Sequence, residues 1–385
     1  MTTRIFVLPL LVILSAVLSG CIDSNEPERM LYVNAIGVDF KDGKYELYTQ
    51  FVSFANTAKS EQPSDSQAVQ TEVGYATGKT MDDAIFELYH SIDQKVYWGH
   101  FSYIVASEEV MSNGKLSPVI DNFIRYHDTR YKVWLYTTKD PVQDVLLVRP
   151  VLNKSVTLSR LGDPQNAYEQ ESFIQPLDIR QLLIALDEPS HEAMIPLISV
   201  KENWKSMKES IKAPVLSGVG IITPISFKGF ISGDKARGIQ WMTNETKRGL
   251  VTIKLDGEHY STVVVNKVKV KIKPIIGKVG VKFDIDVELT AAISSIEQNI
   301  TMGRMRKETE KVVEEQIKET YEEALKKNVD IYHLSEKLYR KNVKEWKKYH
   351  TDGKLELTED SIRNLKVRVT KLTSDRKSYK KTIGK

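Results

Sequence analysis

The pattern of apolar and polar residues is clearest in the last third of the chain, where it has a period of two. The alternating apolar positions of two successive runs are Val263, Val265, Val268, Val270 and Ile272, then Val279, Val281, Phe283, Ile285, Val287 and Leu289. A half-buried strand places every second side chain on its core face. The two runs are separated by the turn sequence PIIGK, and they therefore predict an antiparallel pair of strands.

The residues after this pair change to helical spacing. One apolar stripe consists of Val313, Ile317, Tyr321 and Leu325, and a second, within IYHLSEKLYRKNVKEWKKY, consists of Leu334, Leu338 and Trp346. Such spacing is typical of helices that bury one face. A final strand, LKVRVTKL, places Leu365, Val367 and Val369 on one side. We therefore predict a β-β-α-α-β domain, with both helices packed against one side of a twisted sheet.

The first third of the sequence mixes strand and helix patterns. Two β-rich runs flank Asp42-Gly43, which is the strongest short-range signal for a hairpin. The polar stretch 55–72 has no period and predicts an exposed loop. Thr80 and Asp83 have the capping-box spacing, so a helix should begin near Met81. The runs VYWGHFSYIVAS, LSPVIDNFIRY, YKVWLYTTK and PVQDVLLV then predict strand, helix, strand and helix in one mixed-sheet domain.

The pattern between these two regions is less regular. The stretch ESFIQPLDIRQLLIALDEPSHEAMIPLISV is helical in its middle and is broken by Pro189 and Pro196, which indicates a domain boundary near residue 200. The chain then becomes rich in glycine and in short strands around one short helix, which predicts a small second unit. A chain of 385 residues agrees with two or three domains, at about 100 to 200 residues for each domain.

A different pattern marks the N-terminus, where the basic start MTTR precedes the apolar run Ile5–Leu18. This run is typical of a secretory signal peptide, and it is shorter than the roughly twenty apolar residues that a membrane-spanning helix needs. The sequence Leu18-Ser19-Gly20-Cys21 is similar to a bacterial lipobox. We therefore expect cleavage between Gly20 and Cys21, and a mature chain in which Cys21 carries an S-diacylglyceryl group and an N-acyl group.

Cys21 is the single cysteine of the chain, so no intrachain disulfide can form. A buried or unpaired structural cysteine is the alternative, but a position just after an apolar leader seldom belongs to a folded core. We expect an α+β fold, an elongated three-domain protein with mixed and antiparallel sheets and packed helices. Its expected segments are a lipoprotein signal peptide over 1–20, an N-terminal α+β domain over 21–200, a small middle α+β domain over 201–260 and the β-β-α-α-β domain over 261–385.

The charges narrow the choice of partners. The chain has 55 Lys and Arg against 51 Asp and Glu, and the interspersed signs argue against nucleic-acid binding. The C-terminus is the exception, because six basic residues stand there against Asp375: Lys371, Arg376, Lys377, Lys380, Lys381 and Lys385. These residues either contact anionic lipid headgroups, at about 1 kcal/mol each, or form a solvated tail. No long apolar run follows the leader, so we expect an anchored protein and not a transporter.

No motif indicates catalysis or metal binding. The stretch Gly74–Thr80, GYATGKT, ends like a phosphate-binding loop, but its glycines are one residue too close, and Asp82 and Asp83 follow where phosphate would lie. The seven histidines have no metal-binding spacing, and His100 is interpreted as structural. GxSxG is absent, and the SxxK match Ser374–Lys377 lacks companion motifs. We therefore expect no enzyme activity, no cofactor and no metal.

Several stretches stand in a recognisable order along the chain. They are Cys21 with Asp23 and Glu26, NAIGVD at 34–39, GKTMDDAI before a helix, WGHFSYIVASEEV at 98–110, RGIQWM at 237–242, and NVDIYHLSEKLYRK. Together they resemble the Ger(x)C family, the lipoprotein C subunits of spore nutrient germinant receptors. Ile22 departs from the family pattern, in which Trp commonly follows the cysteine, and this weakens the match of the first mature residues while leaving lipidation intact.

The resemblance implies a non-enzymatic, lipid-anchored subunit on the outer face of the spore inner membrane. It also implies assembly with an A-type and a B-type integral membrane subunit into a receptor for amino acids, sugars or nucleosides. One alternative is a lipid-anchored solute-binding protein of an uptake system, which would close two similar parallel-sheet lobes around a ligand. A membrane-attached hydrolase is a third candidate, disfavoured by the missing catalytic constellation.

Overall fold

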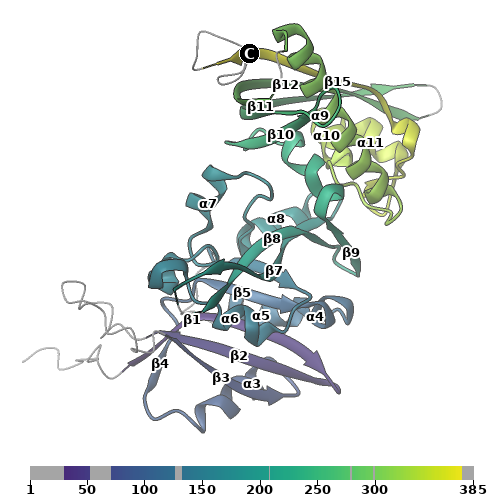
Figure 1. Cartoon of the computed structure of the whole chain (residues 1–385). Coiled ribbons are helices and arrows are strands. Elements are labelled where there is room, and N and C mark those ends of the chain that lie inside the picture. Colours follow the sequence, from purple (N-terminus) through teal and green to yellow (C-terminus); the bar gives the residue numbers. More distant parts are fainter. Residues whose placement is uncertain are drawn as a thin grey trace, which may run out of the picture.

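The computed structural model describes residues 30–52, 71–125, 132–207, 209–277, 280–297 and 300–374. Within these residues the chain is an elongated α+β protein with a large sheet towards each end (Figure 1). The expected fold class, with mixed sheets and packed helices, is confirmed. Of the loop expected over 55–72, residues 55–70 lie outside the described residues, and Thr71 and Glu72 begin a strand.

The first sheet has nine strands. They are β1 (Met30–Lys41), β2 (Lys44–Val52), β3 (Thr71–Gly78), β4 (Lys95–Tyr97), β5 (Tyr103–Ser107), β6 (Trp134–Thr138), β7 (Ala193–Lys205), β8 (Ser210–Ile222) and β9 (Phe227–Ser232). Their order is β3-β2-β1-β5-β6-β7-β8-β9, and β4 pairs with β1. The hairpin predicted from Asp42-Gly43 is confirmed, because these residues join β1 to β2 with φ angles of 52° and 76°, as a two-residue hairpin turn requires.

Helices cover both faces of this sheet. They are α3 (Met81–Tyr89), α4 (Glu108–Ser112), α5 (Leu116–Arg125), α6 (Val142–Leu147), α7 (Pro164–Gln170) and α8 (Ile179–Asp187). The helices α3, α4, α5 and α8 pack on one face, while α6 packs on the opposite face. Strand β5 is parallel to both of its neighbours, and its Ile104 and Tyr103 point into these two different cores. Burial on both faces explains why this strand is a continuous apolar run.

The local signals in this part of the sequence have identifiable structural roles. Thr80 accepts a hydrogen bond from the backbone N–H of Asp83 at 3.1 Å, and α3 begins at Met81 as predicted. The helices predicted from LSPVIDNFIRY and PVQDVLLV are confirmed as α5 and α6. The run VYWGHFSYIVAS is not one strand, because residues 98–102 separate β4 from β5. Two short 3-10 turns, η2 (Val151–Asn153) and η3 (Val156–Leu158), connect α6 to α7.

The predicted middle domain shares strands with both of its neighbours. The boundary expected at residue 200 lies inside β7, and strands β8 and β9 extend the first sheet. The predicted short helix is η4 (Gly233–Met242), which is followed by β10 (Gly249–Lys254) of the second sheet. The boundary expected at residue 260 coincides with the start of β11 (Tyr260–Ile276). The division into three domains stays a prediction.

The second sheet has the order β10-β11-β12-β15. Strand β12 (Val281–Ile296) is antiparallel to β11, which confirms the predicted pair, and it is parallel to β15 (Ile362–Thr373). The pairing register shifts between Val265 and Lys267. Asn266 is therefore the extra residue of a bulge, which explains why the apolar positions step from Val265 to Val268 before their alternation resumes.

Helix α9 (Met302–Leu325) packs on the second sheet with Val313, Ile317 and Tyr321 buried, as predicted. The single helix expected after it is wrong, because two helices are present, α10 (Leu334–Lys341) and α11 (Val343–Tyr349). Asn342 breaks the helix with extended backbone, and its side chain caps α11 by accepting the N–H of Glu345. The small hairpin of β13 (His350–Thr351) and β14 (Lys354–Leu355) and the turn η5 (Glu359–Ser361) then lead to β15.

Candidate functional site

The predicted anchor residue Cys21 and the cleavage position Gly20 lie outside the described residues. The basic tail beyond Ser374 also lies outside them, and Lys371 is an exposed residue of β15. The phosphate-loop look-alike forms the turn from β3 into α3, where a Cβ on Gly78 would lie 2.3 Å from the backbone nitrogen of Ala84. Gly78 therefore allows a tight turn, and Thr80 caps a helix.

His100 is exposed, and its ring lies edge-on to those of Tyr32 and Tyr97, with centroid distances of 5.4 and 5.8 Å. It thus belongs to an aromatic cluster beside the start of β1. In the part of the chain that the structure describes, no three His, Cys, Asp or Glu side chains are grouped so that they could hold a metal ion. No described helix is both long enough and apolar enough to cross a bilayer.

Sequence reasoning missed a polar cluster, built around two buried carboxyl groups, at which the two ends of the molecule meet. Ser190 and Glu192 lie in the turn before β7, Asn328 and Asp330 lie in the loop after α9, and Lys354 lies in β14. We call these five residues the polar joint. Its hydrogen bonds connect residues 138 and 140 positions apart in the sequence, which no local pattern reveals.

Asp330 is the most extensively bonded member of the polar joint and is 2% exposed. Its Oδ2 accepts hydrogen bonds from Ser190 Oγ at 2.8 Å and from the backbone N–H of Ser335 at 2.7 Å. Its Oδ1 accepts the N–H of Leu334 at 2.8 Å. These two N–H groups open helix α10 and have no partner within the helix. One carboxylate therefore both starts α10 and holds it against the turn before β7.

Glu192 is 1% exposed and contacts the same loop. Its Oε2 accepts the backbone N–H of Asp330 at 2.6 Å, and Lys354 Nζ lies 3.5 Å from its Oε1. Burial raises the pKa of Glu192 to about 7, the negative charge of Asp330 adds to this, and Lys354 opposes it. Lys354 also donates to the carbonyl oxygen of Asn328 at 2.7 Å. The polar joint therefore contains a carboxyl group that changes its charge near neutral pH.

The backbone at the polar joint is strained at several non-glycine positions. The φ angles of Ser190, His191, Asn328 and His333 are 98°, 52°, 55° and 51°. Such left-handed residues cost on the order of 1–3 kcal/mol each and persist where the surroundings hold them in place. The N–H of Ser190 donates to the carbonyl oxygen of Gly353 at 3.1 Å, which is one of the contacts that hold this turn.

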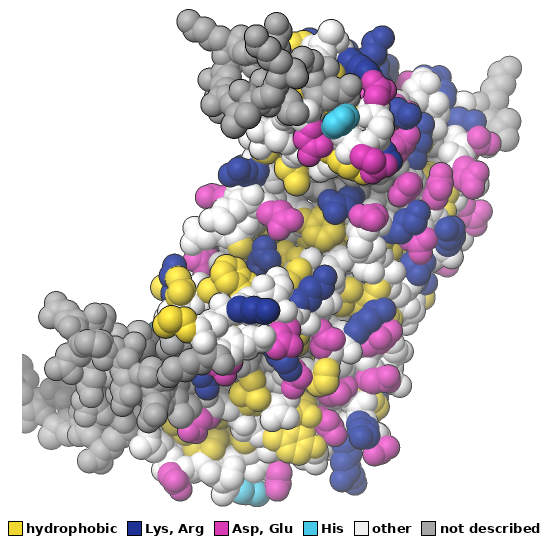
Figure 2. All heavy atoms as spheres, in the orientation of Figure 1, with side chains coloured by type: hydrophobic (Ala, Val, Ile, Leu, Met, Phe, Trp, Pro, Cys, Tyr) yellow, Lys and Arg dark blue, Asp and Glu magenta, His cyan; other side chains and the backbone are white. Residues whose placement is uncertain are grey.

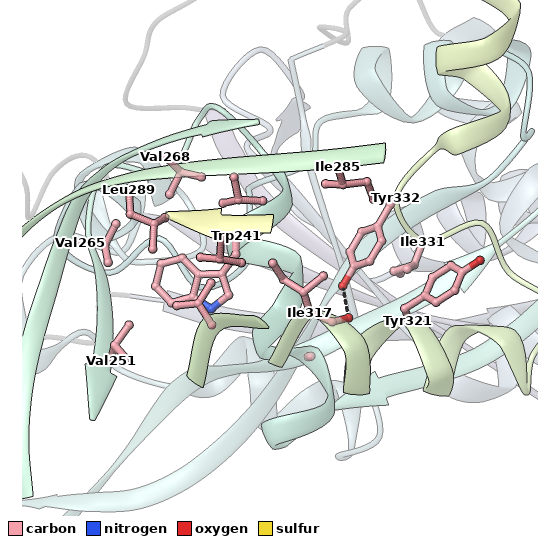
Figure 3. Close-up of a cluster of buried hydrophobic side chains, with 14 of the residues drawn as sticks. Trp241, Val251, Val265, Val268, Ile285, Leu289, Ile317, Tyr321, Ile331 and Tyr332 are labelled. Carbon is pink, nitrogen blue, oxygen red and sulfur yellow. Dashed lines mark hydrogen bonds between the residues drawn. The ribbon is translucent and has the colours of Figure 1, made fainter. Parts of the chain in front are cut away.

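Buried apolar side chains of η4, α9 and the second sheet form one core (Figure 3). Val219 and Ile231 of the first sheet belong to the same cluster as Trp241 of η4 and the inward side chains of the second sheet. Trp241 is fully buried, and its Nε1–H donates to Gln316 of α9 at 2.6 Å. Figure 3 also shows Tyr332, whose hydroxyl donates to the carbonyl oxygen of Ile317 at 2.8 Å. The two ends are therefore joined by a continuous apolar core.

The motif RGIQWM forms the contact between η4 and α9. A Cβ on Gly238 would lie 2.5 Å from the carbonyl oxygen of Gln316, so the two backbones can approach only at a glycine. The N–H of Gly238 donates to Thr320 Oγ1 at 2.9 Å, and the Thr320 hydroxyl donates to the carbonyl oxygen of Lys235 at 2.7 Å. The sequence singled out this motif, and the structure assigns it a packing role.

A cleft of about 320 Å³ opens beside the polar joint. Its walls include Glu192 from the turn before β7, Met194 from β7 and Ile239 from η4. His333, which immediately precedes α10, and Lys337 of α10 also line it. This volume is at the lower end of the range of about 300–1,000 Å³ for small-molecule sites. Ser172 also lines the cleft, but its side chain is fully buried, and its hydroxyl donates to the carbonyl oxygen of Tyr168 and accepts the N–H groups of Lys247 and Arg248. Ser172 therefore serves structure and is not held ready as a nucleophile.

Two family models match the chain in succession. Residues 23–200 match the model described as "Spore germination protein N-terminal domain", and residues 217–370 match "Spore germination B3/ GerAC like, C-terminal". The join between the two matches falls within the β7–β8 hairpin of the first sheet. Together the matches span both sheets and the polar joint.

Similar proteins and one solved structure agree with these matches. Spore germination protein B3 of Bacillus subtilis (strain 168) is 26% identical over 290 residues, which is 73% of this chain and 72% of the relative. Spore germination protein KC of the same organism is 22% identical over 377 residues, 89% of each chain. The crystal structure of the GerBC protein superposes with a TM-score of 0.56 at 20% identity and covers 89% of this chain and 97% of that one. This likeness shows that the two share a fold.

Proposed function

The chain belongs to the Ger(x)C family of spore germination proteins, and from this membership we propose that it is the lipid-anchored C subunit of a spore nutrient germinant receptor. In this role the subunit catalyses no reaction. It assembles with an A-type and a B-type integral membrane subunit on the outer face of the spore inner membrane. There it helps to convert the binding of a nutrient into the start of germination.

The observation that carries this proposal is that both halves of the family pattern occur in order along nearly the whole chain after the leader. The relative named KC is matched over 89% of its length, so the similarity is not confined to one shared domain. The relatives' names place them in spore germination. The lipobox supplies the route to the membrane, because two or three acyl chains on Cys21 hold a water-soluble body on a bilayer nearly permanently.

The internal construction suits a subunit that transmits movement. Inter-domain contacts allow relative motion unless they are large and apolar, and here the apolar core continues from the first sheet into the second. The polar joint adds directional hydrogen bonds between the two ends. This construction supports the proposal that a displacement of the second sheet is passed to the first sheet, where the described chain begins with β1. The uptake alternative is less well supported, because a nine-stranded and a four-stranded sheet are not two similar lobes.

Replacement of the anchor residue tests the proposal. We expect Cys21→Ala to release the protein from spore membranes and to impair germination by nutrients, because one substitution removes every acyl chain. Ser24→Ala, three residues along the same segment, is the matched control and should leave both unchanged. Normal membrane association together with normal nutrient germination in the Cys21→Ala spores would contradict the tether.

The proposed assembly has its own test. Tagged protein recovered from detergent-solubilised spore membranes should bring two integral membrane proteins with it. Recovery of the tagged protein alone from wild-type membranes, under conditions that keep the two membrane subunits associated with each other, would argue against the subunit role. This result would leave the acyl anchor itself unaffected, so the two parts of the proposal fail separately.

A further inference from the structure

The segment between α6 and α7 carries an unusual set of exposed leucines. Leu147 is 45% exposed, Leu152 is 84% exposed and Leu158 is 69% exposed. The segment, residues 147–158, consists of the end of α6 and the turns η2 and η3. Single exposed apolar residues are ordinary on protein surfaces, but several in one short segment mark a binding surface.

This segment lies at the end of the first sheet where the chain enters the fold. Gln50 of β2 donates from its Nε2 to the carbonyl oxygen of Leu146 at 2.5 Å. Val156 packs against Tyr32 of β1 and Val52 of β2, and Met30 joins the same cluster. The turns between α6 and α7 lie beside the start of β1 (Figure 1), and hydrophobic side chains lie at this edge of the molecule (Figure 2).

The charges of the segment have one sign. Arg149 and Lys154 are exposed, and the sequence contains no Asp or Glu between Asp144 and Asp163. Exposed leucines interspersed with cations are typical of segments that lie in the headgroup region of an anionic bilayer. A neighbouring aromatic residue, Tyr97, pairs with Tyr32 in the sheet and is 41% exposed. Tyrosine is enriched at the boundary between lipid and water.

The backbone holds the most exposed leucine in a costly conformation. Leu152 has a φ angle of 62°, in the left-handed region that non-glycine residues seldom adopt. The fold therefore keeps a large apolar side chain at a strained and solvent-exposed turn, where a small polar residue would be more favourable for the free protein. The fold of the free protein gives no reason for a leucine at this position.

We propose that the segment 147–158 contacts the bilayer, with Leu152 and Leu158 inserted among the headgroups of anionic lipid and with Arg149 and Lys154 above them. The inference rests on the acyl anchor of the proposed function. Residues 22–29 separate Cys21 from Met30, so the start of β1 lies at most about 30 Å from the anchored residue. The leucines beside this strand are therefore within reach of the membrane, and the contact fixes the orientation of the protein on it.

A polarity-sensitive fluorophore at position 152 tests this contact in the full-length lipoprotein. Because Cys21 is the natural chain's single cysteine and is acylated, Leu152→Cys supplies one free thiol for labelling. Leu250→Cys in β10, where the leucine is 52% exposed, is the matched control. In vesicles of phosphatidylglycerol and phosphatidylethanolamine, we expect a blue shift of emission and quenching by lipid-borne quenchers at position 152, and neither at position 250.

Each outcome decides the inference. Identical behaviour of the two probes on protein that floats with the vesicles would overturn it and leave the anchor intact. Failure of the wild-type lipoprotein to float would remove the anchor and the inference together. Shielding of position 152 that requires the two membrane subunits would also overturn it, because the segment would then bind protein and not lipid.

The cations give a second measurement. Arg149→Gln and Lys154→Gln should each lower the equilibrium constant for insertion of the position 152 probe about five-fold, since one cation is lost near an anionic surface. Neutral phosphatidylcholine vesicles should remove the difference between these variants and the parent.

In spores, Leu152→Asp should slow nutrient germination while Leu250→Asp does not. Asp tolerates the left-handed backbone at this position, so the change does not act through misfolding.

Discussion

The two sheets differ in how their faces are covered. The first sheet has helices on both faces, and the central strand β5 is buried throughout. The second sheet has α9 on one face, while its other face carries alternating charges. On that face Arg363 pairs with Asp284, and Arg368 lies 3.4 Å from Asp286 and 3.2 Å from Glu288. The first sheet is therefore stabilised by apolar burial on both of its faces. The second sheet is stabilised by apolar burial on one face and carries surface ion pairs on the other.

This difference has energetic consequences. Buried side chains of a doubly covered strand contribute several kcal/mol each through burial and packing. Exposed ion pairs contribute about 0–1 kcal/mol, because water and salt screen them and ordering the side chains costs entropy. Truncation of strand residues on either face of the first sheet should therefore lower the free energy of unfolding strongly. In the second sheet, only truncations on the face that packs against α9 should do so.

The largest expected effect is in the first sheet. Leu135 of β6 is fully buried, and Leu135→Ala should lower the free energy of unfolding by about 2–5 kcal/mol, as other large-to-small core changes do. Lys269→Ala on the open face of β11 is the control and should change stability by less than about 0.5 kcal/mol. Denaturant unfolding of both variants measures the difference, and equal losses would remove the distinction between the sheets.

The next effect concerns the polar joint between the sheets. Because the pKa of Glu192 is about 7 in the folded protein and near 4.5 for an ordinary glutamate, the folded state binds the extra proton between these values. The free energy of unfolding should therefore fall by about 2–3 kcal/mol as the pH rises from 5 to 8. Glu192→Gln should remove this dependence and raise stability at pH 8.

Glu188→Gln provides the comparison for the joint. Glu188 is more exposed, lies outside the polar joint and pairs with Arg340 at 3.2 Å, so the fall in stability attributed to Glu192 should persist in the Glu188→Gln variant. Thermal or denaturant unfolding at a series of pH values distinguishes the two variants. A parent protein whose stability does not change between pH 5 and 8 would show that Glu192 is not held neutral in the joint.

The smallest expected effect is on the charged face of the second sheet. Arg363→Ala removes the partner of Asp284 and should cost at most about 1 kcal/mol at low salt, falling towards zero at high salt. Lys366→Ala, another exposed residue of β15, controls for the loss of a long side chain. If the free energy of unfolding falls by several kcal/mol and the loss persists at high salt, this face of the second sheet is not open to water. The two sheets would then not differ in how their faces are covered.

The same contrast explains what the sequence could predict. A sheet with one covered face leaves a period of two, and the β11–β12 pair is confirmed at the predicted positions that the structure describes, whereas Val279 lies outside the described residues. In the first sheet, short local signals such as Asp42-Gly43 and Thr80 predicted a turn and a helix start. The order of the strands depends on contacts between β1, β5 and β6, which are distant from one another in the sequence. Such contacts produce no periodic pattern of apolar residues from which the order could be predicted.

The candidate site was harder to predict than the fold. Glu192 and Asp330 each look like an ordinary surface acid in the sequence, and their burial follows from a contact across 138 residues. The break at Asn342 was missed because the apolar stripe of Leu334, Leu338 and Trp346 continues in register across it. A cap residue inside an apolar stripe was the available signal. Cys21 stays a prediction, and the signal on which it rests, an apolar leader followed by a lipobox, is entirely local.

The parallel pairing of β15 with β12 sets an order of events during synthesis. Strand β12 ends at Ile296, but its partner β15 begins only at Ile362 and ends at Thr373. A ribosome releases the N-terminal part first, so the first sheet can mature while the edge of β12 is still unpaired. Until β15 arrives, that edge can accept a strand from a neighbouring molecule. A premature stop near residue 360 would therefore yield an aggregating polypeptide and not a shortened folded protein.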